Sequence, residues 1–375
     1  MQSKNRSNTF ENSRICMINQ MAPAYRKAIY QLMDSEMDID WFFGEKVDDI
    51  KEMDMSVLKN VSRFATKRLI SPLYWQCGTA RLLYNPKYNT FLLHGEAFNL
   101  STWAILLLNK FRIKKKKIFI WSHGWYGGEG FWKKWLKRIF FGLADKTFVY
   151  GNYAKEQAIK QGNNSQKIEV IHNSLDHDSQ LRMRTRLLGE PKESRDDDST
   201  KLVFVGRLTP VKRLDLLLDA IKILKSRGEK YRLFLIGDGT ERNKLEKLAD
   251  ESGLNVEFVG ECFEEETIGR YLFKSDICIS PGNVGLTAMH SMVYGTPVIT
   301  HNSFCNQMPE FEAIVEGKTG AFYEYNSAES LAETISKWAM AHRTDREAIR
   351  EACFHEIDEN WTPEFQMEVL KNNIR

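Results

Sequence analysis

Two positive side chains stand five residues apart where a short apolar segment ends. Arg207 follows Gly206 directly, and Lys212 precedes an amphipathic stretch in KLVFVGRLTPVKRLDLLLDAI. A guanidinium offers a planar fork to phosphate oxygens, an ammonium offers a compact charge, and N–H groups at a strand-to-helix turn add donors. The spacing predicts a diphosphate site, and a solvated basic turn is the alternative for this segment taken alone.

Glycine-containing turns follow at later strand ends. FLIGDGT (234–240) predicts a tight turn before a helix, and VEFVG (256–260) predicts a strand that ends in glycine. The loop 281–285 follows the apolar segment DICIS and precedes a helix from about Leu286. Such a loop at the carboxyl end of a strand directs free N–H groups at a ligand.

A histidine in the first half of the chain has a comparable setting. His123 follows the apolar segment KIFIWS and precedes glycines, which places it at a strand end and favours a role in a ligand cleft. His94, at the end of TFLLH, is a weaker second candidate.

The elements that would hold these residues alternate between short β-rich segments and amphipathic helical segments. This order predicts parallel sheets joined by right-handed crossovers. The segment 181–200 is polar and charged, without apolar periodicity, and predicts an interdomain linker or a surface loop. We therefore expect a Rossmann-like domain over 1–180, a linker over 181–200, a second such domain over 201–360, and a helix over 361–375 that packs back on the first.

Composition limits the class of protein. The net charge of +3 combines about +10 over residues 1–180 with about −7 over the remainder, so we expect the first domain to meet an anionic surface. No apolar segment approaches the roughly 18 residues of a membrane span, and the polar N-terminus is unlike a signal peptide.

The segment 131–140 predicts an amphipathic helix. Its apolar face would carry Phe131, Trp132, Trp135, Leu136, Ile139 and Phe140, and its basic face Lys133, Lys134, Lys137 and Arg138. Aromatic residues beside a basic face are typical of helices that bind anionic lipid. A core-packed helix with one solvated face is the alternative. No nucleic-acid-binding module is visible, so we expect no nucleic-acid partner.

The ordered motifs of residues 200–340 resemble the nucleotide-sugar domain of family-4 retaining glycosyltransferases, of the kind that build bacterial polysaccharides. The positions that carry this resemblance are Gly206, Arg207, Lys212, Gly237, Gly239, Phe258, Gly260, Gly285, Leu286, Gly295, Pro297, Val298, Ile299, Glu312, Gly317, Thr319 and Gly320. The resemblance implies the α/β GT-B fold, in which two Rossmann-like domains face each other across a cleft.

The resemblance also assigns roles to individual residues. His123, Arg207 and Lys212 would be catalytic, with His123 on the acceptor side. The donor would be bound by Gly206, Gly237, Gly260, Gly282, Asn283, Val284, Gly285, Leu286 and His290. Two positions depart from the family, because its two glutamates fall on Gly282 and His290.

The expected function is hexosyl transfer with retention, from a nucleoside-diphosphate sugar to a saccharide acceptor, in surface polysaccharide synthesis. A UDP-sugar is the favoured donor, and a lipid-linked saccharide the favoured acceptor. No metal or other cofactor is expected, and the protein would be cytoplasmic and peripheral on the inner face of the membrane. The alternatives are an epimerase or phosphorylase of the same fold and a non-catalytic protein that binds nucleotide-sugars; an NAD dehydrogenase is disfavoured because no complete G-x-G-x-x-G is present.

Overall fold

The computed structural model describes residues 14–45, 50–191 and 198–374. The chain forms two compact units, Met1–Ile171 with Pro363–Arg375 and His172–Thr362. Each unit has its own parallel sheet covered by helices, as the alternation of apolar and amphipathic segments predicted.

The first unit is built on a parallel sheet of seven strands in the order β3-β2-β1-β6-β7-β8-β9. Apolar side chains of these strands alternate between the two faces of the sheet, so both faces are buried. The strands are β1 (Arg14–Asn19), β2 (Ile39–Phe43), β3 (Val61–Arg63), β6 (Tyr88–His94), β7 (Lys117–Ser122), β8 (Lys146–Val149) and β9 (Ile168–Val170). The remaining strands β4 (Thr66–Arg68) and β5 (Tyr74–Gln76) form a hairpin.

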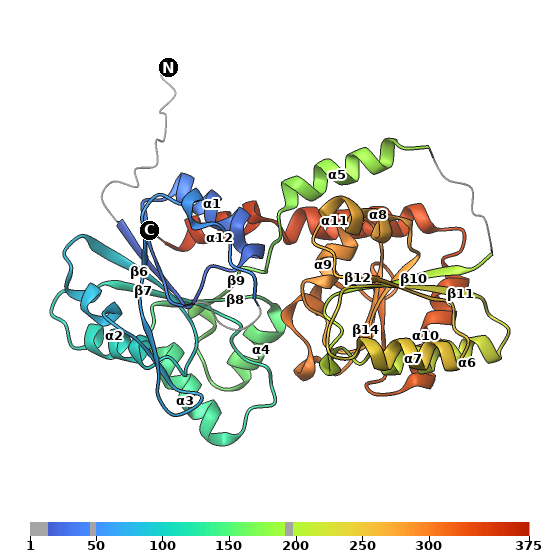
Figure 1. The fold of residues 1–375 in the computed structure, drawn as a ribbon. Coiled ribbons are helices and arrows are strands. Elements are labelled where there is room, and N and C mark those ends of the chain that lie inside the picture. The colour runs from blue at the N-terminus through green and yellow to red at the C-terminus, as the bar shows by residue number, and fades with distance from the viewer. Residues whose placement is uncertain (1–13, 46–49, 192–197, 375) are drawn as a thin grey trace, which may run out of the picture. The chain divides into compact units, whose positions relative to one another are not determined.

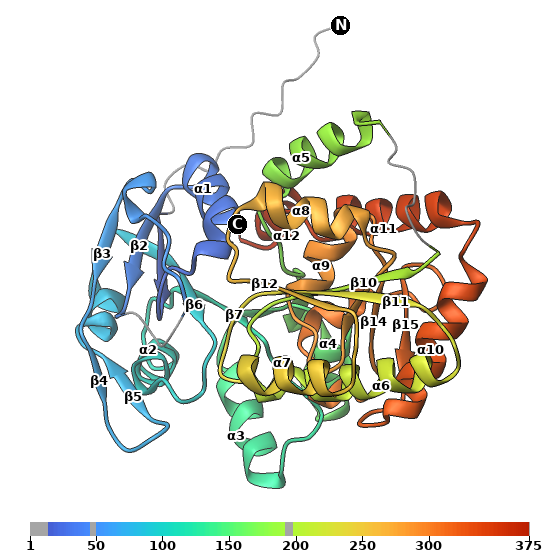
Figure 2. The ribbon, with the colours of Figure 1, turned by 45° about the vertical axis from the view of Figure 1, so that its right-hand side comes forward.

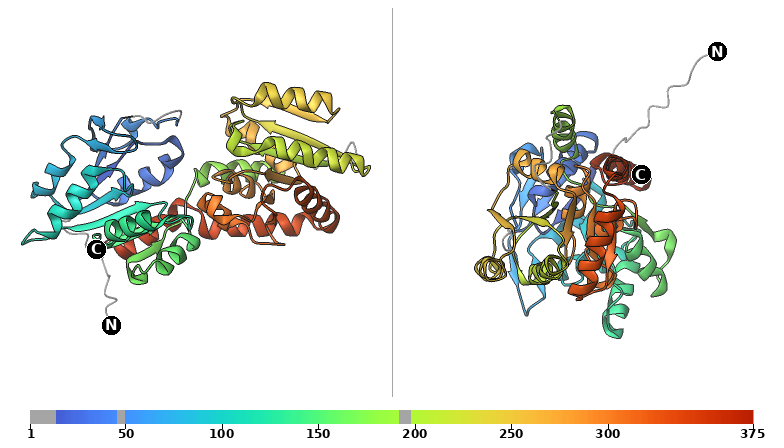
Figure 3. Two further views of the ribbon diagram at one scale, coloured as in Figure 1. Left: turned by 90° about the horizontal axis from the view of Figure 1, so that it is seen from below. Right: turned by 90° about the vertical axis from the view of Figure 1, so that its right-hand side faces the viewer.

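Helices cover the two faces of this sheet (Figure 1). On one face α1 (Lys27–Glu36) packs beside α12 (Pro363–Asn373), which lies at the red end of the colour scale next to the blue α1 (Figure 3). The other face is covered by α2 (Leu100–Lys110), α3 (Phe131–Gly142) and α4 (Asn152–Lys160). Short 3-10 helices complete the unit: η1 (Ala24–Arg26), η2 (Met55–Val57), η3 (Thr79–Tyr84) and η4 (Ser165–Lys167).

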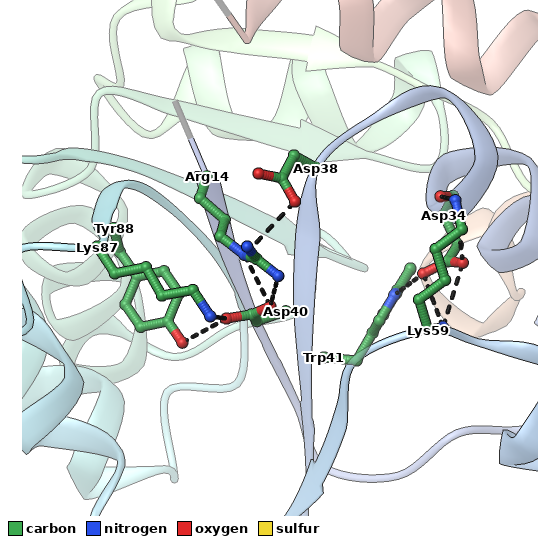
Figure 4. A network of polar contacts seen from close by, with 8 residues as sticks. All are labelled: Arg14, Asp34, Asp38, Asp40, Trp41, Lys59, Lys87 and Tyr88. Atoms are coloured by element: carbon green, nitrogen blue, oxygen red, sulfur yellow. Dashed lines mark hydrogen bonds and ion pairs between the residues drawn. The ribbon is translucent and has the colours of Figure 1, made fainter. Parts of the chain in front are cut away.

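A buried carboxylate ties together the amino-terminal ends of β1, β2 and β6 (Figure 4). Asp40 pairs with Arg14 at 2.8 Å, accepts a hydrogen bond from Tyr88 at 2.7 Å, and pairs with Lys87. Burial acts to raise the pKa of Asp40, but these three partners outweigh it and hold that pKa below its usual value. The network stabilises the edge of the sheet opposite its carboxyl ends.

The second unit is built on a parallel sheet of six strands in the order β12-β11-β10-β13-β14-β15. The strands are β10 (Thr200–Val205), β11 (Tyr231–Ile236), β12 (Val256–Gly260), β13 (Ile277–Ser280), β14 (Val298–His301) and β15 (Gly320–Tyr323). On one side of the sheet lie α6 (Leu214–Ser226), α7 (Arg242–Glu251) and α10 (Ala328–Ala341) (Figure 2). On the other lie α5 (His177–Gly189), α8 (Glu265–Lys274), α9 (Thr287–Met292) and α11 (Arg346–Asn360). Three 3-10 helices are η5 (Pro210–Lys212), η6 (Phe304–Asn306) and η7 (Pro309–Ala313).

The expectation of a linker over 181–200 is wrong for its first half. Residues 181–189 continue α5, which packs against α8, while residues 192–197 lie outside the described residues. The buried face of α5 includes His177, Gln180 and Arg184, and therefore shows little apolar periodicity. Arg184 forms a two-pronged ion pair with Asp358 of α11, at 3.0 and 2.7 Å, and lies over the ring of Phe354.

Each sheet changes the direction of its strand order at one point. In the first unit this point lies between β1 and β6, and in the second between β10 and β13. Ligands of open α/β sheets bind outside the carboxyl ends of the strands at such a point. The predicted class of two Rossmann-like α/β units is confirmed, and the topology indicates one candidate site in each. No helix among the described residues is long and apolar enough to cross a membrane.

Candidate functional site

The candidate donor site lies where the second sheet changes direction. Arg207 and Lys212 follow β10, and the loop 281–286 follows its neighbour β13. The two segments touch, because the N–H of Gly282 donates to the carbonyl oxygen of Lys212 at 2.9 Å. The structure thus brings together Arg207, Lys212 and the loop, with Arg207 exposed on the surface.

Lys212 is held against this loop by its ammonium group. Its Nζ donates to the backbone oxygen of Asn283 at 2.7 Å and to the side-chain oxygen of Asn283 at 3.0 Å. Burial lowers the pKa of Lys212 to about 8, although the nearby Glu310 carboxylate acts to raise it. Lys212 therefore still carries its charge at neutral pH. The described residues contain no group of three or more His, Cys, Asp or Glu side chains arranged for a metal ion.

The packing around Gly282 explains why this position cannot carry the first glutamate of the family that the sequence resembles. A Cβ at this position would stand 2.0 Å from the backbone oxygen of Val211 and 2.7 Å from the Cα of Lys212. Contacts this short exclude every side chain unless the backbone moves. The loop packs so closely on η5 that position 282 presents only backbone, and Asn283 provides the nearest side chain.

The rest of the loop is fixed from several directions. The N–H of Val284 donates to Oε1 of Gln307 at 2.7 Å, and Nε2 of Gln307 donates to Thr300 and to the backbone of His301. The hydroxyl of Thr287 donates to the backbone oxygen of Val205 at 2.9 Å. Gln307, whose role no sequence motif indicated, therefore positions this loop from 23 residues further along the chain.

Three peptide N–H groups of this loop have no acceptor among the described residues. They belong to Asn283, Gly285 and Leu286. Backbone donors of this kind, fixed in place beside a lysine, can hydrogen-bond phosphate oxygens.

The glycines at the ends of β10, β11 and β12 are required for packing. A Cβ on Gly237 would stand 2.0 Å from the carbonyl oxygen of Gly206, and one on Gly239 would stand 2.4 Å from that of Leu208. Gly237 also donates its N–H to Gly260 at 2.8 Å, and Gly260 has φ +88°, which favours glycine. Gly206 lies at the candidate site, whereas Gly237 directly follows β11 and Gly260 ends β12, on the side of β10 away from the loop.

His290 on α9 is bound to a carboxylate that the sequence did not indicate. Its Nε2 lies 2.9 Å from Oε1 of Glu265 on α8, which also accepts a hydrogen bond from Tyr294 at 2.6 Å. Burial acts to raise the pKa of Glu265, but the contact with His290 outweighs it, and the pKa falls to about 2. The position where the family has a glutamate is thus a histidine paired with a glutamate from another helix.

The second candidate site lies where the sheet of the first unit changes direction. A cavity of about 180 Å³ is lined by residues that follow β1, including Arg26, by His94 at the end of β6, and by His123 directly after β7. The two histidines that the sequence placed at strand ends therefore line one cavity. Arg26, which sequence analysis missed, stands in the loop after β1 with no motif around it.

His123 is an uncharged group in this cavity. Burial, followed by the charge of Arg26, lowers the pKa of His123 to about 3. Its ring lies 4.7 Å from that of Tyr150, and its buried Nδ1 has no hydrogen-bond partner in the described part of the chain. At neutral pH His123 can exchange hydrogen bonds with a ligand and provides no charge.

A larger cavity, of about 530 Å³, lies elsewhere in the second unit. It is lined by Thr200, Tyr231 and Ile277 at the amino-terminal ends of their strands. This is the edge opposite the one that carries Lys212, so the larger cavity is separate from the candidate donor site.

The surface of α3 differs from the expected pattern at two positions. Phe131, Trp132 and Trp135 are 74%, 77% and 53% exposed, so the core-packed alternative is wrong for them. Phe140, expected on the same face, is fully buried instead. Lys137, expected on the basic face, is also buried, and its ammonium pairs with Glu129 at 2.8 Å.

Comparison with known proteins finds sequence similarity that includes most of the second unit. Residues 189–353 match the family model described as "Glycosyl transferases group 1". A GDP-mannose-dependent alpha-(1-6)-phosphatidylinositol dimannoside mannosyltransferase of Mycobacterium tuberculosis is 29% identical over 137 residues, which are 36% of this chain and 34% of that protein. A D-inositol 3-phosphate glycosyltransferase of Mycolicibacterium smegmatis is 25% identical over 229 residues, which are 58% of this chain and 50% of that one. The chain thus spans between a third and a half of the length of these relatives.

Solved structures resemble the chain over almost its whole length. The lipopolysaccharide outer core galactosyltransferase WaaB superposes with a TM-score of 0.71 at 16% identity, covering 96% of this chain and 99% of that one. Anabaena Alr3699/HepE in complex with UDP superposes with a TM-score of 0.70 at 13% identity, covering 96% and 99%. These neighbours confirm the GT-B fold class. The similarity in sequence to glycosyltransferases rests on the match over residues 189–353 and on the curated relatives.

Proposed function

We propose that the chain is a retaining hexosyltransferase, in which the second unit binds a nucleoside-diphosphate sugar and the first binds a saccharide acceptor. The observation that carries the proposal is the contact of Lys212 with the loop at Asn283, where an ammonium and three backbone donors gather beside Arg207. This arrangement suits the two phosphates of a nucleotide-sugar.

The proposed chemistry is stabilisation of a leaving group. The bond between the anomeric carbon and the diphosphate oxygen breaks, and an acceptor hydroxyl oxygen bonds to that carbon on the same face while its proton passes to the departing diphosphate oxygen. Negative charge grows on the diphosphate, and Lys212, Arg207 and the loop N–H groups would stabilise it. In this proposal these positive groups act without a metal ion.

The donor is proposed to be a UDP-sugar. The solved structures of Alr3699/HepE include one with UDP and one with UDP-glucose, which supports uridine. The mycobacterial relative uses GDP-mannose, so the base has to be measured. His290 with Glu265, on two helices of the donor unit, is proposed to bind the ribose.

The acceptor is proposed to be a lipid-linked saccharide used in surface polysaccharide synthesis. His123 would contact the reacting groups from the first unit. The exposed aromatic residues of α3, with Lys133, Lys134 and Arg138 beside them, support binding to anionic lipid at the inner face of the membrane. A cytoplasmic protein bound peripherally to that surface is the corresponding location.

A panel of nucleotides and donors tests the proposal. UDP, GDP and dTDP are compared by thermal stabilisation, and the corresponding sugar nucleotides are then incubated with saccharide acceptors. We expect one base to stabilise the protein most and its sugar donor to give a product whose anomeric configuration, read by NMR, matches the donor. Because Gly282 offers no side chain to the sugar, a non-catalytic binding protein is the second candidate. Nucleotide binding without turnover would favour it, and release of free nucleotide with an isomerised sugar would indicate an epimerase.

A further inference from the structure

Arg26 is a buried cation for which the described residues provide no carboxylate. Its side chain belongs to η1, directly after β1, and the residue is only 6% exposed. The guanidinium lies over the rings of Trp121 at 5.0 Å, Tyr150 at 5.3 Å and Tyr25 at 5.7 Å. Within the described chain no ion pair involves Arg26, although other buried cations such as Lys137 and Arg184 have one.

This arrangement leaves a positive charge at the wall of the cavity without an acidic partner among the described residues. An arginine remains protonated in proteins, and a buried charge is costly unless it is paired or hydrogen-bonded. The side chains of Tyr25 and Tyr30, which hydrogen-bond with Arg26, and the aromatic rings around it carry no negative charge and compensate only part of that cost. A residue so placed, lining a cavity, is stabilised when an anion enters and completes its hydrogen bonds.

The groups around the cavity favour an anion over a neutral ligand. His94 and His123 line the cavity, and burial lowers the pKa of both. The two rings therefore add hydrogen-bond donors and carry no negative charge that would neutralise Arg26. The charge of Glu96 opposes the lowering of the pKa of His94, and the Glu96 carboxylate accepts a hydrogen bond from Tyr74 at 2.6 Å.

The place and size of the cavity indicate which part of a ligand it holds. It lies at the carboxyl ends of β1, β6 and β7, where an open α/β sheet binds its ligand. Its volume of about 180 Å³ is below the roughly 300–1,000 Å³ of pockets that enclose a whole ligand. It can therefore enclose one end group, and the rest of the ligand would extend out of it.

We propose that the cavity lined by Arg26, His94 and His123 binds a phosphoryl group carried by the acceptor. Arg26 donates two parallel hydrogen bonds to phosphoryl oxygens, and the histidine rings add single ones. That the ligand is the acceptor rests on the proposed function; that the cavity binds a phosphoryl group does not. A phosphate on a lipid carrier and one on a soluble sugar share this chemistry.

Binding to the full chain tests the proposal without any transfer reaction. Inorganic phosphate, glucose 1-phosphate and glucose are titrated calorimetrically, with tryptophan fluorescence as a second reading because Trp121 contacts the guanidinium. The variants are Arg26→Gln, which removes the charge, and Arg26→Lys, which keeps it and loses the fork. Arg14→Gln is the matched control, since Arg14 lies at the opposite edge of the same sheet. All are measured in an Arg207→Ala/Lys212→Ala background, so that phosphate at the second unit does not contribute.

We expect saturable binding of phosphate and glucose 1-phosphate, and none of glucose. Arg26→Gln should weaken glucose 1-phosphate at least tenfold, and Arg14→Gln should leave it unchanged. Arg26→Lys, the more conservative change, should also weaken the binding of glucose 1-phosphate. It keeps the test decisive if Arg26→Gln does not fold. Farnesyl phosphate in detergent identifies a lipid carrier if it binds more tightly than glucose 1-phosphate, and a soluble acceptor if it binds less tightly.

Three results would overturn the proposal. They are the absence of saturable phosphate binding, equal affinity in the wild type and both Arg26 variants, and glucose binding as tightly as glucose 1-phosphate. Failure of the proposed function is distinguishable, because a protein without transferase activity can still bind phosphate through Arg26.

Discussion

The candidate sites of the two units lie at equivalent points of similar sheets. They differ in whether their positive or titratable side chains have a carboxylate nearby. In the second unit, Lys212 has the Glu310 carboxylate nearby, and His290 is paired with Glu265. In the first unit, the described residues pair Arg26 with no carboxylate and place two neutral histidines beside it. Topology therefore fixes where each site forms, and the placement of carboxylates decides how much positive charge is left for a ligand.

The same contrast extends to the net charges of the two units. The first unit, Met1–Ile171 with Pro363–Arg375, carries an excess of about twelve positive charges, whereas the second carries an excess of about nine negative ones. The second unit is therefore acidic overall with two cations at its loop site, and the first is basic overall as well as in its cavity. The predictions below test each side of this difference.

Removal of the cations of the donor site should have the largest effect. Arg207→Ala and Lys212→Ala should each lower kcat/KM by an amount that corresponds to a loss of about 2–4 kcal/mol in transition-state stabilisation. The reason is that the two native side chains neutralise the leaving diphosphate. Steady-state kinetics with the identified donor measure the loss, and thermal melts show that the fold is intact. Lys222→Ala, on the exposed side of α6, is the control. Full activity in either site variant would contradict the donor assignment.

The exposed face of α3 should account for membrane binding. Changing Lys133, Lys134 and Arg138 to Gln together should weaken binding to anionic vesicles by about 3 kcal/mol, from about 1 kcal/mol per charge near the surface. Vesicle sedimentation measures this, and binding of the wild type should fall with added salt.

Two matched aromatic changes separate membrane binding from folding. Trp135→Ala should reduce vesicle binding and leave the fold intact, since Trp135 is 53% exposed. Phe140→Ala should destabilise the first unit by about 3–5 kcal/mol, because Phe140 is fully buried. Unchanged vesicle binding by the triple Gln variant at low salt would contradict the role of α3.

Donor use should depend on the proton of Lys212. Because its pKa is about 8, the ammonium is present below that pH and is lost as the pH rises through it. The value of kcat/KM should then fall about tenfold per pH unit above the pKa. Lys212→Arg keeps the charge and should remove this alkaline decline. A decline that persists unchanged in Lys212→Arg would assign it to another group.

The pair of His290 and Glu265 should make a smaller contribution, to stability. The pKa of Glu265 is lowered to about 2, so its stabilising effect is complete above its unfolded value, near 4.5, and is lost as the pH falls towards 2. Glu265 is about one-third exposed, so screening reduces the effect to about 1 kcal/mol. Urea unfolding of Glu265→Gln should show that deficit at pH 7 and a smaller one at pH 3. Glu261→Gln, which is exposed, should show neither.

Much of the fold could be predicted because its strands are buried on both faces. Segments such as TFLLH and KIFIWS contain continuous apolar runs, and both form strands that end at or directly before the predicted histidines. The helix α5 could not be predicted in this way. Its buried Arg184 is stabilised by Asp358, which is 174 residues away in the sequence.

The candidate sites were predictable only where a motif marks a strand end. The positions of Arg207, Lys212 and the loop from Gly282 follow from the order of apolar segments and glycines. Gln307 and Glu265 carry no such mark, because each acts through a hydrogen bond to a residue from another element. The burial of Lys137 could not be predicted for the same reason. Its ammonium pairs with Glu129, which precedes the helix, and so Lys137 is buried instead of lying on the exposed basic face. Arg26 could not be found from the sequence, because what distinguishes it is that the described chain provides no carboxylate for its buried guanidinium.

The helix α12 affects the order in which the protein can be completed during translation. Met367, Leu370 and Ile374 belong to the same buried cluster as Ile15, Met17 and Trp41. A ribosome delivers α12 only after the whole of His172–Thr362 has been made. Until α12 has been synthesised, one face of the sheet of the first unit is incompletely covered, although all strands of the second unit have already been made. The unit that begins first is the last to finish, and in that interval its exposed apolar face is the surface that chaperones would have to protect.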